Sequence, residues 1–545
     1  MRKILIAFAT VIVSFFSGAE TLVTNVKGYH LVAGELQTFS ALSFDNDQVT
    51  GLYQSRPNTD RYSIVIDAKG KTLLPGLIDA HGHVYGYGLT LSRVNLMGIA
   101  SLKDAKAQIA KFYADHPEQK WILGRGWNQE LWPSRAFPTA NDLDSISKDK
   151  PIVLDRVDGH ALWVNSKVLA MAGIDKSTES PAGGEIVKDE NGNPTGILVD
   201  NAMDMVFKLI PKPDIEQVKD TLVLSLNKLA TLGLTSVHDA GIDYLTYRAY
   251  RALHEEGRMP IRVYAMLDVT DPNYEKMLKA SFYLPADGML HIRSVKISAD
   301  GALGSRGAAL HEAYSDKPGH FGLLLHTRDK LNALTKKAMQ AGFQVNTHAI
   351  GDKANTLALD SFANYIETTG TQKLRHRIEH AQVVRVGEFD RFVELEVVAS
   401  MQPTHATSDK NMAEDRVGSK RIKGAYAWQT LLKKGVVIAG GSDFPVEPAE
   451  PFFGLHAAVT RQDRANQPEG GWYANESVDM TQAFAMVTTD AAFSAHQEQL
   501  IGNLEVGKQA DFILIDSDPF AIDPALLWQV SVDSTYVAGQ LITGQ

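Results

Sequence analysis

The chain has 545 residues, more than one average domain, and 44% of them are apolar, which is enough for large buried cores. A formal net charge of -10 with no basic stripe argues against nucleic acid as a partner. The sequence contains no cysteine, which excludes disulfides and thiol nucleophiles, so a metal must be bound by histidine, carboxylate or modified lysine side chains.

The first residues predict a secretory signal peptide, residues 1–19. Arg2 and Lys3 form a short basic segment, and the apolar run over residues 4–16 is too short to span a bilayer comfortably. Small side chains at residues 17–19 supply a cleavage site. The alternative is an uncleaved membrane anchor. Cleavage predicts a periplasmic or secreted protein with no stable membrane insertion.

Both ends of the remaining chain contain short segments that are typical of strands. These segments are residues 41–44, 63–66, 512–515 and 534–537. Each end has too few strands to bury a sheet alone. We therefore expect residues 20–74 and 485–545 to form one composite β-sandwich domain.

Between these ends, over residues 75–484, apolar strands alternate with helical stretches. The predicted strands are residues 76–81, 234–239, 261–266, 292–297, 343–348, 377–380, 397–401 and 436–440. One helix is expected over residues 214–232, with Asp214 as its N-cap and Gly233 at its end. Eight such strands predict an α/β fold, a TIM (β/α)8 barrel. The stretch between the first two strands is too long for one crossover helix, so we expect an inserted subdomain at residues 115–211.

Polar residues occupy the C-terminal ends of these strands, where TIM barrels carry their functional groups. They are His81, His83, Lys296, His348, His380 and Asp443. Because side chains repeat every two residues along a strand, His81 and His83 point to the same side and suit one cation. A lysine at the end of an apolar strand must be paired or lose its charge. Lys296 therefore either pairs with Asp300 or Asp443, or reacts with carbon dioxide to give a carbamate that bridges two cations.

Several longer motifs carry a resemblance to a known family. The motifs lie at residues 121–127, 158–160, 295–306, 348–352, 377–382, 401–405, 441–447 and 507–512. They resemble the amidohydrolase superfamily, and specifically its YtcJ-like branch, which includes N-substituted formamide deformylases. The resemblance covers essentially the whole chain after the signal peptide. One departure is Met412, where the branch often carries a tryptophan, and this leaves the substrate preference open.

The resemblance implies a metal-dependent hydrolase acting on carbon–nitrogen bonds other than peptide bonds, in a small amide or formamide. It implies that all six strand-end residues bind one or two divalent ions, with Lys296 carboxylated. Zinc is the expected metal, because it lowers the pKa of bound water to about 7 and so supplies hydroxide for attack on the substrate carbonyl. Asp443 is the expected general base, and Lys296 the second catalytic residue.

Six further residues are expected to contact the substrate. They are Trp127, Trp132, Asp158, His160, Arg306 and His405. The first four lie in the predicted insertion, and the other two lie near the fourth and seventh strands. For Trp127 and Trp132 the alternative is ordinary packing in a core.

Three other functions stay open at this point. The same site could hydrolyse an ester, lactone or phosphotriester, because the attack on the substrate is shared. A mononuclear deaminase of the superfamily typically has a glutamate where this chain has Gly351, and it would leave Lys296 without a role. A periplasmic binding protein for a metal or solute would not require so many converging ligands. A small-molecule substrate is expected, whereas its identity and the choice between monomer and homo-oligomer stay open.

Overall fold

The computed structural model describes residues 20–156 and 159–544. The predicted signal peptide and Asp158 lie outside the described residues. The chain divides into two compact units. Among the described residues, the first unit comprises residues 20–82, 227–244 and 259–544, and the second comprises residues 83–156, 159–226 and 245–258.

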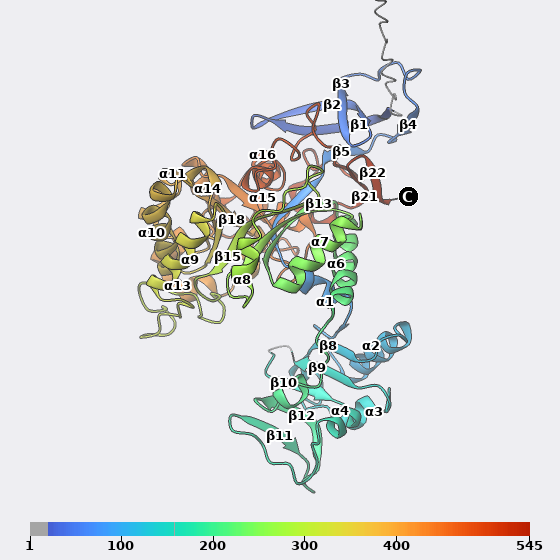
Figure 1. The fold of residues 1–545 in the computed structure, drawn as a ribbon, viewed down its shortest axis with the longest axis vertical. Coiled ribbons are helices and arrows are strands. Elements are labelled where there is room, and N and C mark those ends of the chain that lie inside the picture. Colours follow the sequence, from blue (N-terminus) through green and yellow to red (C-terminus); the bar gives the residue numbers. More distant parts are fainter. Residues whose placement is uncertain (1–19, 157–158, 545) are drawn as a thin grey trace, which may run out of the picture. The chain divides into compact units, whose positions relative to one another are not determined.

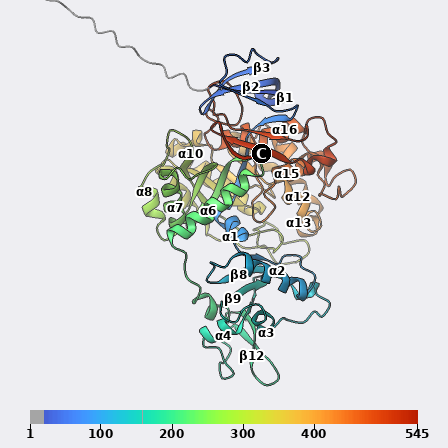
Figure 2. The same ribbon diagram turned by 90° about the vertical axis from the view of Figure 1, so that its right-hand side faces the viewer.

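Both ends of the chain contribute to one eight-stranded sheet in the first unit, as expected. Its strands are β1 (Thr21–Val32), β2 (Glu35–Asp45), β3 (Gln48–Tyr53), β4 (Ile64–Asp67), β5 (Thr72–Pro75), β20 (Phe512–Ile515), β21 (Val532–Val537) and β22 (Gln540–Gly544). The antiparallel pair β5–β20, with Leu74 opposite Ile513, joins the two ends. Phe44 and Phe512 pack in the core, with ring centroids 5.7 Å apart. Figure 1 and Figure 2 show the first and last strands at the same end of this unit.

The eight predicted barrel strands form a second sheet in the order β19-β18-β17-β16-β15-β14-β13-β6. They are β6 (Leu77–Gly82), β13 (Leu234–Ile242), β14 (Arg262–Asp268), β15 (Leu290–Ser298), β16 (Gln344–Ala349), β17 (Arg377–His380), β18 (Val398–Met401) and β19 (Ile438–Gly440). Each neighbouring pair is parallel, so all eight C-terminal ends lie on one rim. The predicted TIM-like barrel is therefore confirmed.

Polar contacts join the two outer strands of this sheet, β6 and β19. The Asp443 backbone N–H donates to the His81 carbonyl at 2.7 Å. The buried Asp79 carboxylate accepts from the Ser442 hydroxyl at 2.6 Å and from the His81 backbone N–H at 3.0 Å. Burial raises the pKa of Asp79 to about 7, although these hydrogen bonds oppose the shift. The nearly closed barrel thus brings Asp443 beside His81.

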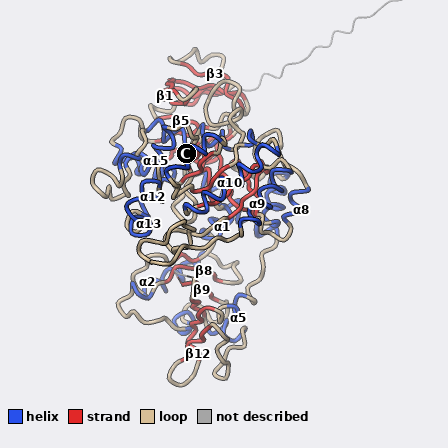
Figure 3. The backbone as a smooth tube through the Cα atoms, turned by 90° about the vertical axis from the view of Figure 1, so that its left-hand side faces the viewer, coloured by secondary structure: helices blue, strands red, loops and turns tan. Residues whose placement is uncertain are grey.

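Helices of the first unit follow the strands along the chain, and Figure 3 shows them outside the strands. They are α8 (Tyr274–Lys279), α9 (Arg328–Gln340), α10 (Asp352–Thr369), α11 (Phe389–Glu394), α12 (Pro403–Asp409), α13 (Ala413–Arg421), α14 (Trp428–Lys433), α15 (Pro451–Thr460), α16 (Met480–Met486) and α17 (Thr489–Ser494). Helix α9 is typical: the Thr327 hydroxyl caps its start, and one face buries Leu331 and Ala338. Among the described residues, no helix has the length and apolar character needed to cross a membrane.

The second unit contains the insertion, whose sheet has the order β11-β12-β10-β9-β8-β7. The elements from α1 to α7 in this part of the chain are α1 (Val84–Leu91), β7 (Val94–Asn95), α2 (Leu102–Asp115), β8 (Ile122–Trp127), α3 (Ala140–Asp144), β9 (Ile152–Arg156), β10 (Ala161–Val164), α4 (Ser166–Met171), β11 (Gly184–Lys188), β12 (Pro194–Asp200), α5 (Asp204–Phe207), α6 (Ile215–Ala230) and α7 (Tyr244–Glu255). The sheet starts before residue 115, because β7 pairs with β8 through Val94 and Gly124. Helix α6 closely matches the helix expected over residues 214–232.

Candidate metal centre

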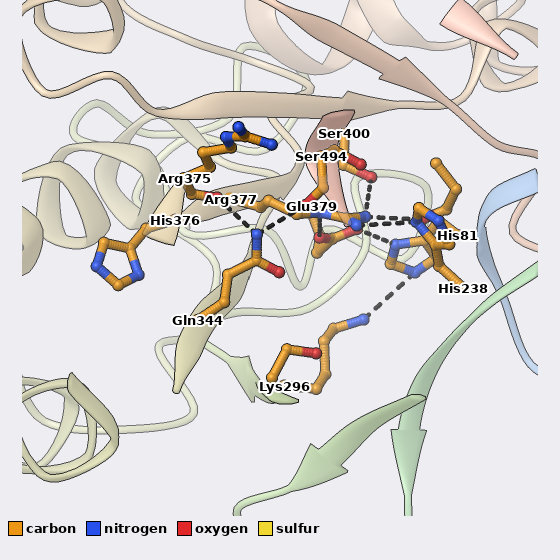
Figure 4. A network of polar contacts seen from close by, with 12 residues as sticks. His81, His238, Lys296, Gln344, Arg375, His376, Arg377, Glu379, Ser400 and Ser494 are labelled. Atoms are coloured by element: carbon orange, nitrogen blue, oxygen red, sulfur yellow. Dashed lines mark hydrogen bonds and ion pairs between the residues drawn. The ribbon is translucent and has the colours of Figure 1, made fainter. Parts of the chain in front are cut away.

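His81 lies at the C-terminal end of β6, and its side chain is fully buried. The Glu379 carboxylate contacts Nδ1 of the His81 ring, so that nitrogen carries the proton and Nε2 keeps its lone pair. Nε2 lies 3.3 Å from Lys296 Nζ (Figure 4) and 3.6 Å from Asp443 Oδ1. Burial, followed by the charge of Lys296, lowers the pKa of His81 to about 4. The ring is therefore neutral at neutral pH, as a metal ligand must be.

A buried ion pair on β17 holds Glu379 in place (Figure 4). Arg377 Nε lies 2.7 Å from Glu379 Oε1, and Arg377 also donates to the Ala80 carbonyl at 2.7 Å and the Ser400 hydroxyl at 2.8 Å. Burial alone would raise the pKa of Glu379, but the charge of Arg377 and the contact with His81 outweigh it and hold that pKa well below its usual range. Glu379 therefore stays ionised and orients the His81 ring.

Sequence reasoning did not assign a role to this ion pair. The signal was present in the strand at residues 377–380, where two of four residues carry a charge. Charged side chains on a strand inside a barrel must be paired, because an isolated buried charge is very costly. That composition could have identified Arg377 and Glu379 as a pair, although their contact with His81 depends on tertiary structure.

Lys296 lies near the end of β15 and is 7% exposed. Its ammonium group contacts Nε2 of His81, and burial lowers the pKa of Lys296 from its ordinary value. Among the residues that the structure describes, Lys296 forms no ion pair with Asp300 or Asp443, the alternative considered above. Asp300 instead accepts backbone hydrogen bonds from Ile350, Gly351 and Ala309 at 2.8 to 3.0 Å. The carbamate stays a prediction.

His348 and His380 lie at the ends of β16 and β17, with ring centroids 4.5 Å apart. The Gln402 side-chain carbonyl lies 2.8 Å from Nδ1 of His380, so Nδ1 donates and Nε2 keeps its lone pair. Nε2 of His348 is buried and has no hydrogen-bond partner among the described residues; its nearest carboxylate, Asp300, is 3.5 Å away. Burial lowers the pKa of His348 to about 3, so this ring is also neutral.

Asp443 follows β19, and its two carboxylate oxygens face different histidines. Oδ1 lies 3.6 Å from Nε2 of His81, and Oδ2 lies 3.7 Å from Nε2 of His405. Ligand atoms of His380, His405 and Asp443 all lie within 4.8 Å of one another. His405, expected to contact the substrate, thus lies within the cluster of predicted ligands. His83 directly follows Gly82, where the chain passes to the second unit, and its role as a ligand stays a prediction.

These residues fit a divalent cation. Imidazole nitrogens and carboxylate oxygens are suitable ligands for zinc and related ions. Bonds of about 2.0–2.2 Å at tetrahedral angles separate two ligand atoms by about 3.5 Å, and the contacts of Asp443 with His81 and His405 measure 3.6 and 3.7 Å. Nε2 atoms of His348 and His405 are buried without hydrogen-bond partners among the described residues. Leaving such atoms unsatisfied is costly, and a bound ion would remove that cost.

Residues 64–543 match the Amidohydrolase family. The chain belongs to the amidohydrolase family. It is 34% identical over 495 residues to the putative amidohydrolase YtcJ of Bacillus subtilis, covering 89% of this chain and 91% of that protein. N-substituted formamide deformylase of Arthrobacter pascens is 25% identical over 495 residues, with coverage of 88% and 89%. An uncharacterised metal-dependent hydrolase of Pyrococcus horikoshii superposes with a TM-score of 0.76 at 28% identity, covering 93% of this chain and 99% of that one. This amidohydrolase is therefore a YtcJ-like hydrolase.

The remaining expected substrate contacts that lie within the described residues form contacts with other residues of the protein. Trp127 and Trp132 are buried in the core of the second unit, which is compatible with the packing alternative stated above. His160, in the same unit, has a side chain 74% exposed, and its Nδ1 lies 2.8 Å from Asp200 Oδ1. Arg306 donates twice to Asp316, at 3.1 and 2.8 Å. Contact of these residues with a substrate stays a prediction.

Proposed function

We propose that this amidohydrolase cleaves a carbon–nitrogen bond other than a peptide bond in a small amide or formamide. The observation that carries the proposal is the cluster of histidines around Asp443 and Lys296 on one barrel rim. Similarity to a formamide deformylase over most of the chain supports the choice of bond. Zinc is the proposed metal, because the donor atoms are imidazole and carboxylate.

The residues that would hold the metal share a strand-end position. They are His81, His83, Lys296, His348, His380 and Asp443. A bound divalent ion supplies hydroxide at neutral pH and polarises the substrate carbonyl. Glu379 and Gln402 fix the orientation of two of the ligand rings by accepting their Nδ1 protons. These hydrogen bonds leave both Nε2 lone pairs ready for the ion before it binds.

Asp443 is the proposed general base and acid. Its carboxylate is buried and lies between the rings of His81 and His405, so a water held at the cluster is within its reach. Asp443 accepts a proton from the attacking water, whose oxygen forms a new bond to the substrate carbonyl carbon. The carbon–nitrogen bond then breaks, and Asp443 returns the proton to the leaving nitrogen. The products are a carboxylic acid and an amine.

Lys296 is proposed to be carboxylated. After its ammonium group has lost one proton, the neutral Nζ would form a bond to the carbon of carbon dioxide and release a second proton to solvent, and the resulting carbamate would be a ligand for two cations. Support comes from its position, because the side chain is buried and its terminal nitrogen lies 3.3 Å from a predicted metal ligand. An anionic carbamate between cations would stabilise this buried position better than an ammonium beside a ligand ring.

A substrate panel with measured metal content tests the reaction. The panel pairs formamides and amides with esters and lactones of the same acyl groups, and it includes amino-heterocycles as deaminase substrates. We expect turnover of amides or formamides, loss of that turnover on chelation, and recovery with Zn²⁺. Turnover restricted to esters, or to deamination, would overturn the proposed bond specificity.

Labelling with ¹³C-bicarbonate tests the carbamate. We expect a carbamate carbon signal in the wild-type NMR spectrum that disappears in Lys296→Ala. Lys111→Ala is the matched control, because Lys111 is an exposed helical lysine paired with Asp115, and it should retain the signal. An identical spectrum for wild type and Lys296→Ala would remove the carbamate from the mechanism.

We also propose that the protein is exported and that residues 1–19 are removed, on the basis of the basic and apolar pattern of those residues. Expression of the full chain, followed by fractionation and N-terminal sequencing, tests this. A mature chain that starts at Glu20 in the periplasm or medium is the expected result. An intact N-terminus in the membrane fraction would support the anchor instead.

A further inference from the structure

His405 occupies a fixed position on α12, immediately after barrel strand β18. The helix has Gln402 as its N-cap residue and Pro403 in its first turn, where a missing backbone N–H is tolerated. The His405 backbone N–H donates to the Gln402 carbonyl at 3.1 Å. The Gln402 side chain also accepts from His380, so one residue positions both rings.

The other end of α12 is also held by buried polar contacts. Asp409, one turn after His405, accepts from the Tyr426 hydroxyl at 2.7 Å and from the Gln382 side-chain amide at 3.0 Å. Tyr426 is itself buried. Because both ends of this short helix are anchored, the direction of the His405 ring is set by the fold rather than by a flexible loop.

The free side of the His405 ring faces the other predicted ligands. Its ring stacks against that of His380, with centroids 5.8 Å apart and planes at 18°. Its Nε2 is buried, and it forms no hydrogen bond with any residue that the structure describes. Asp443 Oδ2 lies 3.7 Å from this nitrogen, too far for a hydrogen bond but close to the separation of two ligands of one tetrahedral ion.

We infer that His405 binds a divalent cation together with His380 and Asp443. Asp443 then contacts ligand rings on two sides, because its second carboxylate oxygen, Oδ1, faces His81. The inference rests on the proposed function in that it concerns a cation of the same hydrolase site. It replaces the expected substrate contact of His405 with a metal-binding role.

Replacement of His405 by cysteine provides a direct test. The chain has no cysteine, so His405→Cys introduces its single thiol. A thiolate bound to Co²⁺ gives a sulfur-to-metal charge-transfer absorption that imidazole and carboxylate ligands do not give. We expect this band when the metal-free variant receives stoichiometric Co²⁺. The matched control is Ser408→Cys on the same helix, whose side chain is exposed and turned toward Glu447, and it should show no band.

Absence of the band from a folded, Co²⁺-loaded His405→Cys protein would overturn the inference. Should that variant fail to give the wild-type circular dichroism spectrum, His405→Ala decides the question. Its Co²⁺ dissociation constant should rise about tenfold or more, and an unchanged constant would also overturn the inference. Because both measurements report metal ligation without turnover, they remain informative if wild-type protein proves inactive on amides, which would count against the proposed function alone.

Discussion

The barrel-rim cluster and the tryptophan cluster of the second unit are both buried groups of ring side chains, but their ring nitrogens differ. The tryptophan cluster consists of Trp127, Trp132 and Trp163, and each of these three indole N–H groups donates to a backbone carbonyl. The donors and acceptors are Trp127 to Leu154 at 2.8 Å, Trp132 to Ile99 at 3.1 Å and Trp163 to Thr139 at 2.8 Å. On the rim, Nε2 of His348 and of His405 lack hydrogen-bond partners among the described residues.

This difference in hydrogen bonding distinguishes the packed tryptophan core from the candidate metal site. The three indole rings pack with their ring centroids 6.3 to 6.5 Å apart, and each of their N–H groups has a hydrogen-bond acceptor. This core therefore has no polar ring atom that needs a further ligand. A buried nitrogen without a partner is unfavourable on its own. On the rim, two such nitrogens lie in one cluster with the Asp443 carboxylate, and this convergence supports a metal site where burial of the rings alone would not.

Asp443→Asn should produce the largest effect, at the rim. Loss of the general base should lower kcat by about 10²–10⁴-fold at saturating metal. Steady-state kinetics with metal analysis measures this, and Asp415→Asn, an exposed position on α13, serves as the control. Turnover close to wild type in metal-loaded Asp443→Asn would remove the proton-transfer role.

Trp132→Ala tests the other cluster. Removal of this buried ring should lower the free energy of unfolding by about 3–5 kcal/mol, with metal content unchanged. Chemical denaturation followed by circular dichroism measures the loss. The neighbouring Leu131 is 50% exposed, so Leu131→Ala should change stability by only about 0.5 kcal/mol. A raised KM with unchanged stability would instead support a substrate contact for Trp132.

Glu379→Gln should weaken metal binding without removing a ligand. The change takes away the charge that orients His81, and metal affinity should fall about 10–100-fold. Competition with a chelator measures the affinity. Glu498→Gln is the control, because Glu498 also pairs with an arginine, Arg375 at 2.6 Å, but not with a predicted ligand. Equal affinity in both variants would show that the ion pair on β17 serves stability alone.

Asp79→Asn should give the smallest effect, a pH trend in stability. The pKa of Asp79 is raised to about 7 in the folded protein from an ordinary 3.8. The unfolded chain therefore releases this proton first, and the contribution of Asp79 to stability falls as pH rises from about 4 to 7. Asparagine has no such proton, so the penalty of Asp79→Asn should be smaller at pH 8 than at pH 5. The penalty of Trp132→Ala should stay constant, and the same constancy for Asp79→Asn would contradict the raised pKa.

Several features could be predicted from local sequence because they depend on neighbours along the chain. Alternating apolar strands and helices predicted all eight barrel strands, and the polar residues at their ends followed from the same pattern. Parallel strands place these ends on one rim, so residues as distant as His81 and Asp443 could be predicted to meet. Each end of the chain has too few strands to bury a sheet alone, and this predicted the sheet that both ends form together through β5 and β20.

Other features were decided only by tertiary structure, because they depend on atoms from elements distant in sequence. The contact of Glu379 with His81 joins β17 to β6, and no local pattern specifies which carboxylate reaches which ring. His405 and Trp132 looked alike in sequence as candidate substrate contacts. In the folded protein, the indole N–H of Trp132 has a hydrogen-bond acceptor within its core, whereas α12 directs the Nε2 of His405 into the ligand cluster. Whether a buried polar atom finds a partner on another helix or strand is decided only when the chain folds.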